Sequence, residues 1–405
     1  MKIKVLHIVG GQPDNGAYKG AHILHKALLS SDIDSKILND IPNLDNDKKF
    51  DQELIYFNNN LFKKYLRKIF IFLEKIIKST YLPIRRSTYT LGLFGYDITK
   101  FEEYKNSDII HIHWLSAGFI NFKTLFKTNK TIIWTMRDMW PFTGGSHYTM
   151  DFENFEKSFI SKIIKNIKKK SFKKNIQFVA ISNWLKKEAE KSFVLEKKDI
   201  IRVYNNIDLR EFKQVEKNLA RSQLDIKTKK HVMLIGAQNP QATRKGWAIF
   251  LKTLKKLDNN KYFILIFGNF WSQKILDDAG FEYKSMGYIN DNKKLSLIYS
   301  SADFFVFSSL QEAFGKTWAE SLACKTPVVC FKNTAASEFI DHKFNGYICD
   351  EHDPHKLKDG IEWLSNEFNH NSLKQIPEKV LSIDAKIIAK EYIEIYLNAL
   401  NKQKN

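Results

Sequence analysis

The chain has few of the residues that build disulfide-linked or low-complexity proteins. It holds three cysteines in 405 residues, at positions 324, 330 and 349, which is too few and an odd number for a disulfide scaffold. We therefore expect reduced thiols and a cytosolic compartment. Eight prolines and 17 glycines exclude a collagen-like or low-complexity chain, and 14% aromatic residues argue against intrinsic disorder.

Long apolar runs are also missing. The longest, at 69–73 and 262–268, have the length of a strand and fall short of the ~18 apolar residues of a membrane-spanning helix. The first apolar run is interrupted by His7 and ends at Gly10, so we expect no signal peptide. These features predict a cytoplasmic protein without a transmembrane segment.

Positive charge is in excess and is concentrated in the first half of the chain. The 64 Lys and Arg residues outnumber the 45 Asp and Glu residues, which gives a net charge of +19. Residues 1–200 hold 34 basic and 21 acidic side chains, whereas residues 201–405 hold 30 and 24. The first half is therefore expected to meet an acidic partner, which could be nucleic acid, an anionic membrane or an anionic substrate.

Apolar runs of strand length alternate with helical segments. These runs lie at 1–11, 107–114, 130–136, 176–182, 231–237, 262–268, 302–309 and 327–331. Strands separated by helices build parallel sheets covered on both faces, so we expect an α/β fold with two doubly wound, Rossmann-like domains. The Asn-rich turn at 204–212 predicts domains 1–205 and 206–383, followed by a helix at 384–402.

Two basic stretches interrupt this alternation. Residues 62–87 hold eight Lys or Arg and one acid, Glu74, whereas residues 157–174 hold eight Lys and no acid. In the second stretch Ile160, Ile163, Ile164 and Ile167 share one helix face, with lysines on the other. A basic amphipathic helix is typical of membrane-surface binding. The alternative is a surface helix that packs its isoleucines on the core.

The segment 308–329 combines a strand end, a short loop and a helix start. The loop carries Glu312, Phe314 and Gly315, and Glu320 follows on the helix. Free backbone N–H groups at a helix start favour anions, and glycine lets a ligand approach the backbone. The carboxylates suit sugar and ribose hydroxyls, although two solvated acids remain the alternative.

This segment resembles retaining glycosyltransferases of family 4, which have two Rossmann domains in a GT-B fold. The stretch EAFGKTWAESLACKTPVV matches the E-x7-E signature and its flanks. The resemblance implies that Glu312 contacts the sugar of a nucleotide-sugar donor and Glu320 its ribose, with Phe314, Gly315 and Lys316 in the same loop. It also implies that the second domain binds the donor, the first binds the acceptor, and the last helix packs on the first domain.

Other segments resemble the same family. In GAQNPQATRKGW (236–247), Arg244 and Lys245 stand where the family binds the donor diphosphate, although Ala237 replaces a frequent arginine. Gly16, in the loop at 10–28, stands beside the transferred sugar in that comparison. The turn at 204–212 resembles the N-G-I-D segment of the domain junction, with Asn206 in place of Gly.

The stretch WTMRDMWPFTGGSHY (134–148) resembles H-D-M-W-P-F-T-G-G-C-H-Y of a bacterial polysaccharide and lipopolysaccharide subgroup. Arg137 replaces the His of that pattern, which is placed at the reaction centre, and Ser146 replaces the Cys. Arginine cannot act as a base near neutral pH, but it can bind a phosphate or another anion. The resemblance also implies that Asp138 and His147 contact the acceptor.

Several other patterns carry less information. His111 and His113 share one strand face and could begin a metal site, but no partner cluster is evident in the sequence. Asp353-Pro354 is typical of a helix start, and residues 45–47 form a D-x-D in a polar loop. We therefore expect no metal and no cofactor.

Together these features predict a metal-independent, retaining hexosyltransferase of bacterial surface polysaccharide biosynthesis. It would transfer sugar from a nucleotide-sugar to a lipid-linked or glycan acceptor, peripherally bound to the inner face of the cytoplasmic membrane. A nucleic-acid-binding protein, which we do not expect, and an inactive glycosyltransferase-fold scaffold are the alternatives. The donor base and sugar, the acceptor linkage and the oligomeric state stay open.

Overall fold

The computed structural model describes residues 2–40, 54–56, 61–79, 89–172, 175–237, 242–269 and 273–404. The D-x-D at 45–47 lies outside these residues, as do parts of both basic stretches. The chain forms two compact units, and each is described by itself. Unit 1 comprises Met1–Asn206 and Ala385–Asn405, and unit 2 comprises Ile207–Asp384. These boundaries differ by one residue from those expected from the sequence.

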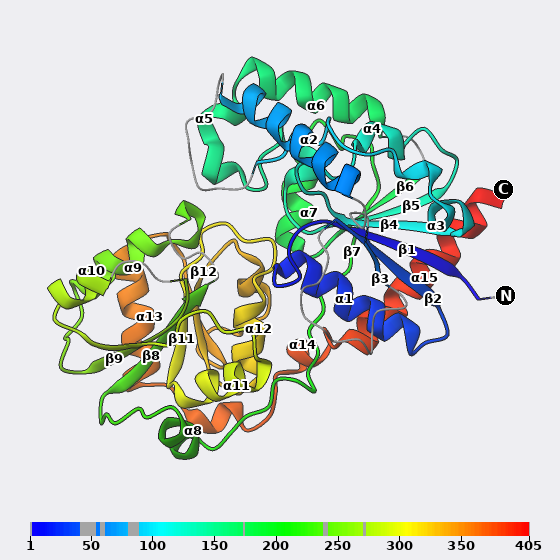
Figure 1. Ribbon diagram of the computed structural model, residues 1–405. Coiled ribbons are helices and arrows are strands. Elements are labelled where there is room, and N and C mark those ends of the chain that lie inside the picture. Colours follow the sequence, from blue (N-terminus) through cyan, green and yellow to red (C-terminus); the bar gives the residue numbers. More distant parts are fainter. Residues whose placement is uncertain are drawn as a thin grey trace. The chain divides into compact units, whose positions relative to one another are not determined.

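Unit 1 is built on a seven-stranded parallel sheet of order β3-β2-β1-β4-β5-β6-β7 (Figure 1). The strands are β1 Lys4–Val9, β2 Asp34–Asn39, β3 Leu54–Tyr56, β4 Ile109–Trp114, β5 Thr131–Met136, β6 Ile176–Ala180 and β7 Ile200–Arg202. The central strands are buried along most of their length, as expected for a parallel sheet covered on both faces.

The helices of unit 1 include the last helix of the chain. They are α1 Gly16–Leu29, α2 Leu61–Ser79, α3 Glu102–Asn106, α4 Phe122–Leu125, α5 Glu153–Glu156, α6 Phe159–Ser171, α7 Asn183–Glu190 and α15 Ala385–Lys404. Ile388, Tyr392 and Tyr396 of α15 join Val5 and Ile109 in one buried cluster. The apolar face of α15 therefore packs into the core of unit 1.

Unit 2 has a six-stranded parallel sheet of order β10-β9-β8-β11-β12-β13. Its strands are β8 His231–Ala237, β9 Tyr262–Gly268, β10 Glu282–Ser285, β11 Phe304–Phe307, β12 Val328–Phe331 and β13 Gly346–Cys349. Its helices are α8 Lys217–Gln223, α9 Trp247–Leu254, α10 Gln273–Asp278, α11 Asn292–Ser301, α12 Lys316–Ala323, α13 Pro354–Asn366 and α14 Glu378–Leu381. Two parallel α/β domains confirm the expected fold class.

The basic helix α6 departs from the expected division into an isoleucine face and a solvated lysine face. Ile164 is buried and Ile160 packs on a small cluster with Tyr89, but Ile163 is exposed. Lys168 is fully buried, with its Nζ donating to the carbonyls of Trp140 and Thr143. The prediction of a solvated lysine face is therefore wrong at Lys168, because this ammonium group satisfies two buried carbonyl groups.

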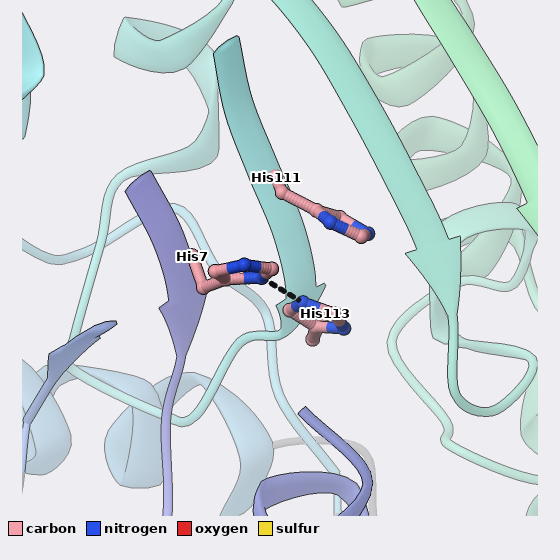
Figure 2. Close-up of side chains that lie close together, drawn as sticks. All are labelled: His7, His111 and His113. Atoms are coloured by element: carbon pink, nitrogen blue, oxygen red, sulfur yellow. Dashed lines mark hydrogen bonds between the residues drawn. The ribbon is translucent and has the colours of Figure 1, made fainter. Parts of the chain in front are cut away.

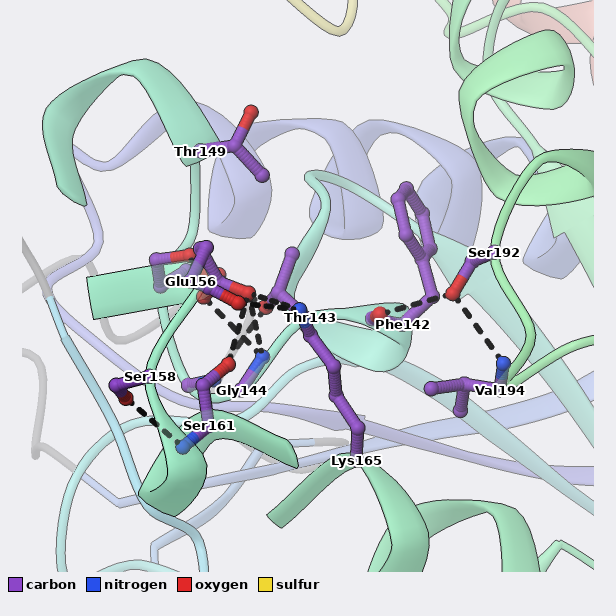
Figure 3. A network of polar contacts seen from close by, with 12 residues as sticks. Phe142, Thr143, Gly144, Thr149, Glu156, Ser158, Ser161, Lys165, Ser192 and Val194 are labelled. Carbon is purple, nitrogen blue, oxygen red and sulfur yellow. Dashed lines mark hydrogen bonds and ion pairs between the residues drawn. The ribbon is translucent and has the colours of Figure 1, made fainter. Parts of the chain in front are cut away.

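Glu156 ties α6 to the Gly-Gly turn of the 134–148 stretch (Figure 3). Its carboxylate accepts from the backbone N–H of Gly144 and from the hydroxyls of Ser146 and Ser161, and it pairs with Lys165 at 2.7 Å. A side chain at position 144 would place its Cβ 2.1 Å from the Ser161 hydroxyl, so this close packing requires glycine.

Membrane crossing requires a helix that is both long and apolar. Among the helices that the structure describes, none combines sufficient length with sufficient apolar character to cross a bilayer.

Candidate active site

Two loops of unit 2 are joined by hydrogen bonds at the carboxyl end of its sheet. The first, Thr243–Lys245, is a short 3-10 turn, and the second follows β11. The backbone N–H of Leu310 donates to the carbonyl of Arg244 at 2.7 Å, and the Ser308 hydroxyl donates to that of Lys245 at 2.8 Å. Gly246 has φ +68° and its missing Cβ would lie 1.9 Å from the Ser308 oxygen. Only glycine fits this contact.

The two loops bring together three residues that the sequence assigned to the donor. Glu312 is 6% exposed, and its Oε2 accepts from Nη1 of Arg244 at 2.9 Å and from Nζ of Lys245. Because the carboxylate and both cations are largely removed from water, they interact more strongly than a surface ion pair. The site therefore holds one negative and two positive charges within hydrogen-bond distance.

The start of α12 lies next to Glu312. Gly315 has φ +72°, and a Cβ there would lie 2.8 Å from Cγ of Glu312 and 2.6 Å from Phe307. Phe314 is buried against Trp318, with ring centroids 5.0 Å apart, and this contact fixes the loop before the helix begins at Lys316. The first N–H groups of α12 and the two cations together can bind an anionic group.

Glu320 lies one to two turns further along α12. Its Oε2 accepts from the hydroxyl of Tyr299 at 2.8 Å. Burial, followed by the Glu320 charge, raises the pKa of Tyr299 well above its usual value, so this phenol remains a donor. The hydrogen bond fixes the orientation of the Glu320 carboxylate.

In unit 1, Arg137 is buried directly after β5. Its Nη2 donates to Nδ1 of His113 at 3.0 Å and its Nη1 donates to Oδ1 of Asn205. Burial lowers the pKa of Arg137 to about 10, so the guanidinium keeps its charge near neutrality. Among the described residues no carboxylate forms an ion pair with it. A side chain at Gly20 would place its Cβ 2.6 Å from Nη1, so α1 leaves room for this guanidinium.

Arg137 begins a chain of hydrogen bonds through two histidines. Because His113 Nδ1 accepts from Arg137, its Nε2 carries the proton and donates to Nδ1 of His7 at 2.8 Å (Figure 2). The remaining proton of His7 is then on Nε2, which is buried without a hydrogen-bond partner. The arginine at position 137 therefore sets the tautomers of His113 and His7.

His111 completes a buried cluster in which ring nitrogens of His7, His111 and His113 lie within 4.8 Å. The sequence reasoning missed His7, because it lies on β1, about a hundred positions from the others. Burial lowers the pKa of all three well below the usual value, so they are neutral. A metal on Nε2 of His113 would require a proton on Nδ1, which faces the Arg137 donors. The cluster therefore fits a hydrogen-bond network better than a metal site.

Asp138 and His147, the two residues expected to contact the acceptor, form hydrogen bonds within unit 1. Asp138 accepts from the indole N–H of Trp114 at 2.7 Å and lies 2.6 Å from Nδ1 of His147. The other nitrogen of His147 is 3.1 Å from the hydroxyl of Thr90. In this structure Asp138 and His147 hold the loop after β5 in place, and acceptor contact stays a prediction.

Gly16 opens α1, after the loop that follows β1. Asn15 caps this helix, because its Oδ1 accepts a hydrogen bond from the backbone N–H of Ala17 at 2.7 Å. Apart from the chain neighbours and the backbone of α1 itself, no atom of the described residues would lie within 4 Å of a Cβ at Gly16, so the space beside it is open.

Solved structures share this architecture. A sucrose-phosphate synthase from Thermosynechococcus elongatus has a TM-score of 0.72 at 14% identity, covering 99% of this chain and 100% of that one. Anabaena HepE in complex with UDP-glucose gives 0.66 at 15% identity, covering 98% and 100%. WaaG, a glycosyltransferase involved in lipopolysaccharide biosynthesis, gives 0.65 at 11%, covering 97% and 99%. The two domains define a GT-B glycosyltransferase fold.

The second domain matches a sequence family. Residues 216–378 match the family of glycosyl transferases group 1, so the chain carries a group 1 glycosyltransferase domain. An uncharacterized glycosyltransferase of Methanocaldococcus jannaschii is 26% identical over 59% of this chain. The alpha-monoglucosyldiacylglycerol synthase of Streptococcus pneumoniae is 34% identical over 26% of it. These matches span 64% and 23% of the relatives' own lengths, which is less than two thirds.

Proposed function

We propose that this protein is a retaining, metal-independent hexosyltransferase. It transfers a sugar from a nucleotide-diphosphate-sugar to a lipid-linked or glycan acceptor in bacterial surface polysaccharide biosynthesis. The observation that carries the proposal is the convergence of Arg244 and Lys245 on Glu312 beside the start of α12. This arrangement offers cations for a diphosphate and a carboxylate for sugar hydroxyls within one site.

Donor binding would change the partners of these charges. The diphosphate would replace Glu312 as the partner of Arg244 and Lys245, and the N–H groups at the start of α12 would add to its binding. Glu312 would then accept hydrogen bonds from the donor sugar, and Glu320 would accept them from the ribose. The two cations would stabilise the charge that develops on the leaving diphosphate.

We also propose how the acceptor is bound and how the transfer retains the configuration of the donor sugar. In retaining transfer on the front face of the sugar, a leaving phosphate oxygen takes the proton of the acceptor hydroxyl, so no protein base is required. Arg137, with no acidic partner among the described residues, would bind an anionic group of the substrate. Unit 1 would hold the acceptor near Gly16, Asp138 and His147, and unit 2 would hold the donor.

The compared proteins support these assignments in part. HepE was solved with UDP-glucose, WaaG is involved in lipopolysaccharide biosynthesis, and the pneumococcal relative is named for a glucosylated diacylglycerol. The net charge of +19 supports peripheral binding to an anionic membrane on its cytoplasmic face. Nucleotide-sugar, amphiphilic acceptor and membrane are therefore the partners we propose.

The test is a panel of UDP-, GDP- and ADP-linked hexoses incubated with the full chain. We expect slow hydrolysis of one donor, faster transfer to a short-chain lipid-linked acceptor, and a product that keeps the anomeric configuration of the donor by NMR. Glu351→Gln, at an exposed acid of unit 2, is the control for Glu312→Gln. A folded protein that turns over no donor and binds no nucleoside diphosphate would instead be a scaffold.

A further inference from the structure

Helix α2 of unit 1 exposes apolar side chains along one side. Leu61, Phe62, Tyr65, Ile69, Phe72 and Ile76 are 39–82% exposed. At 100° per residue these positions fall within one sector of about 100° of the helix. Monomeric soluble proteins seldom expose a continuous apolar strip of this kind, which is typical of an interaction surface. We call these six residues the α2 strip.

The opposite side of α2 is fixed to unit 1, so the strip cannot turn inward. The buried carboxylate of Glu74 accepts from the backbone N–H groups of Leu91 and Gly92, at 3.2 and 3.1 Å. Arg67 pairs with the buried Asp40. The only acid of α2 therefore points into the protein, and the strip faces outward with a defined orientation.

The charges around the strip decide which partner it fits. Lys64, Lys68 and Lys75 are exposed and lie along one edge of the strip, and the exposed side of α2 has no acid. A symmetric contact between two copies would place these lysines near their own equivalents, which is unfavourable. An anionic lipid surface complements them, and aromatic and aliphatic side chains enter the acyl region beneath the headgroups.

We propose that the α2 strip inserts into an anionic lipid bilayer and is the membrane-docking face of unit 1. Helix α6 extends this face with exposed Phe159 and Ile163, and Ile77 of α2 and Ile160 of α6 pack on the same small cluster. The proposal goes beyond membrane attraction by net charge, because it assigns insertion to one helix face. It also differs from the sequence-based expectation for 157–174, since Lys168 is buried.

The experiment is sedimentation of the full chain with vesicles of phosphatidylcholine, alone or mixed with phosphatidylglycerol, at low and high salt. We expect binding to the mixed vesicles that weakens with salt but is not abolished, because screening does not weaken apolar insertion. Phe62→Ser/Phe72→Ser/Ile76→Ser should lower the partition coefficient by roughly tenfold or more. Its melting temperature and its hydrolysis of a soluble donor should remain those of the parent chain.

Two lysine variants with the same change of charge locate the surface. Lys64→Gln/Lys68→Gln/Lys75→Gln should weaken binding at low salt, whereas Lys255→Gln/Lys256→Gln/Lys293→Gln, at exposed positions of unit 2, should bind nearly as the parent. Equal losses in the two lysine variants, or normal binding of the apolar variant, would overturn the proposal. A dimer in light scattering that the apolar variant loses, with no vesicle binding by the parent, would assign the strip to a second copy instead. Neither result depends on donor turnover.

Discussion

Arg244 and Glu312 lie 68 positions apart in the sequence, and Nη1 of the first donates to Oε2 of the second at 2.9 Å. Lys245 donates to the same oxygen, so one carboxylate pairs with both cations in this structure. We infer that a donor diphosphate has to displace Glu312 from these cations. The same carboxylate would then be released toward the donor sugar, which would couple phosphate binding to sugar binding.

Glu312→Gln separates these two roles. We expect transfer to fall by roughly 10²–10³-fold, because an amide stabilises developing positive charge on the sugar less well than a carboxylate. The affinity for nucleoside diphosphate should not fall, since Arg244 and Lys245 lose an internal competitor. Steady-state kinetics and calorimetric titration measure the two quantities. Near-normal turnover would remove Glu312 from the reaction centre.

Lys245→Ala tests the diphosphate assignment. We expect the affinity for the preferred nucleoside diphosphate to fall by about 1.5–3 kcal/mol, the range for hydrogen bonds to charged groups. The nucleoside alone should lose far less, and Arg244→Ala should show a smaller version of the same pattern. Lys252→Ala, at an exposed position of α9, is the control. Equal losses for nucleotide and nucleoside would contradict a phosphate role.

Glu320→Ala should mainly raise the KM for the donor. Ribose contacts are similar in the ground state and the transition state, so kcat should change much less. Tyr299→Phe removes the hydrogen bond that orients Glu320 and should shift KM in the same direction by a smaller factor. The measurement is donor-dependent initial rates, and an unchanged KM in Glu320→Ala would mean that this residue does not contact the ribose.

Lys168 links stability to pH. Burial lowers its pKa to about 7 from the ordinary 10.5, while nearby Glu156 and Asp138 oppose the shift and Lys165 adds to it. The unfolded chain keeps this proton up to the ordinary pKa, whereas the folded chain releases it near pH 7. The contribution of Lys168 to the free energy of unfolding therefore rises with pH between these values. Lys168→Met should lack this rise in urea unfolding at several pH values, and exposed Lys170→Met should retain it.

Arg137 is expected to affect stability and activity separately. Arg137→Ala leaves Nδ1 of His113 and Oδ1 of Asn205 without their donor, which should lower the free energy of unfolding by about 1–3 kcal/mol. Arg137→Lys should lose activity, because it lacks the planar fork, and Arg137→His is expected to keep part of it. Denaturant unfolding and initial rates give the two readouts. An alanine variant unchanged in both would place Arg137 outside the reaction centre.

Much of the fold and part of the site could be predicted from local patterns. Alternating apolar runs and helical spacing predict two parallel α/β domains, since the period of the apolar residues indicates whether a segment is a strand or a helix. The loop that holds Glu312, Phe314 and Gly315 is contiguous, so its resemblance to the family signature can be recognised without any knowledge of packing. The apolar spacing likewise predicts the helix at 384–402, but it does not predict which residues of unit 1 this helix contacts.

The remaining features depended on contacts between distant segments. His7 joins His111 and His113 only because β1 and β4 are neighbours in the sheet. Lys168 is buried because α6 packs where two carbonyl groups need a donor. The α2 strip is exposed because Glu74 and Arg67, on the opposite face of the helix, bind to the rest of unit 1. A helical pattern specifies which side chains share a face. Which face is buried depends on the neighbouring elements, and only the tertiary structure decided that.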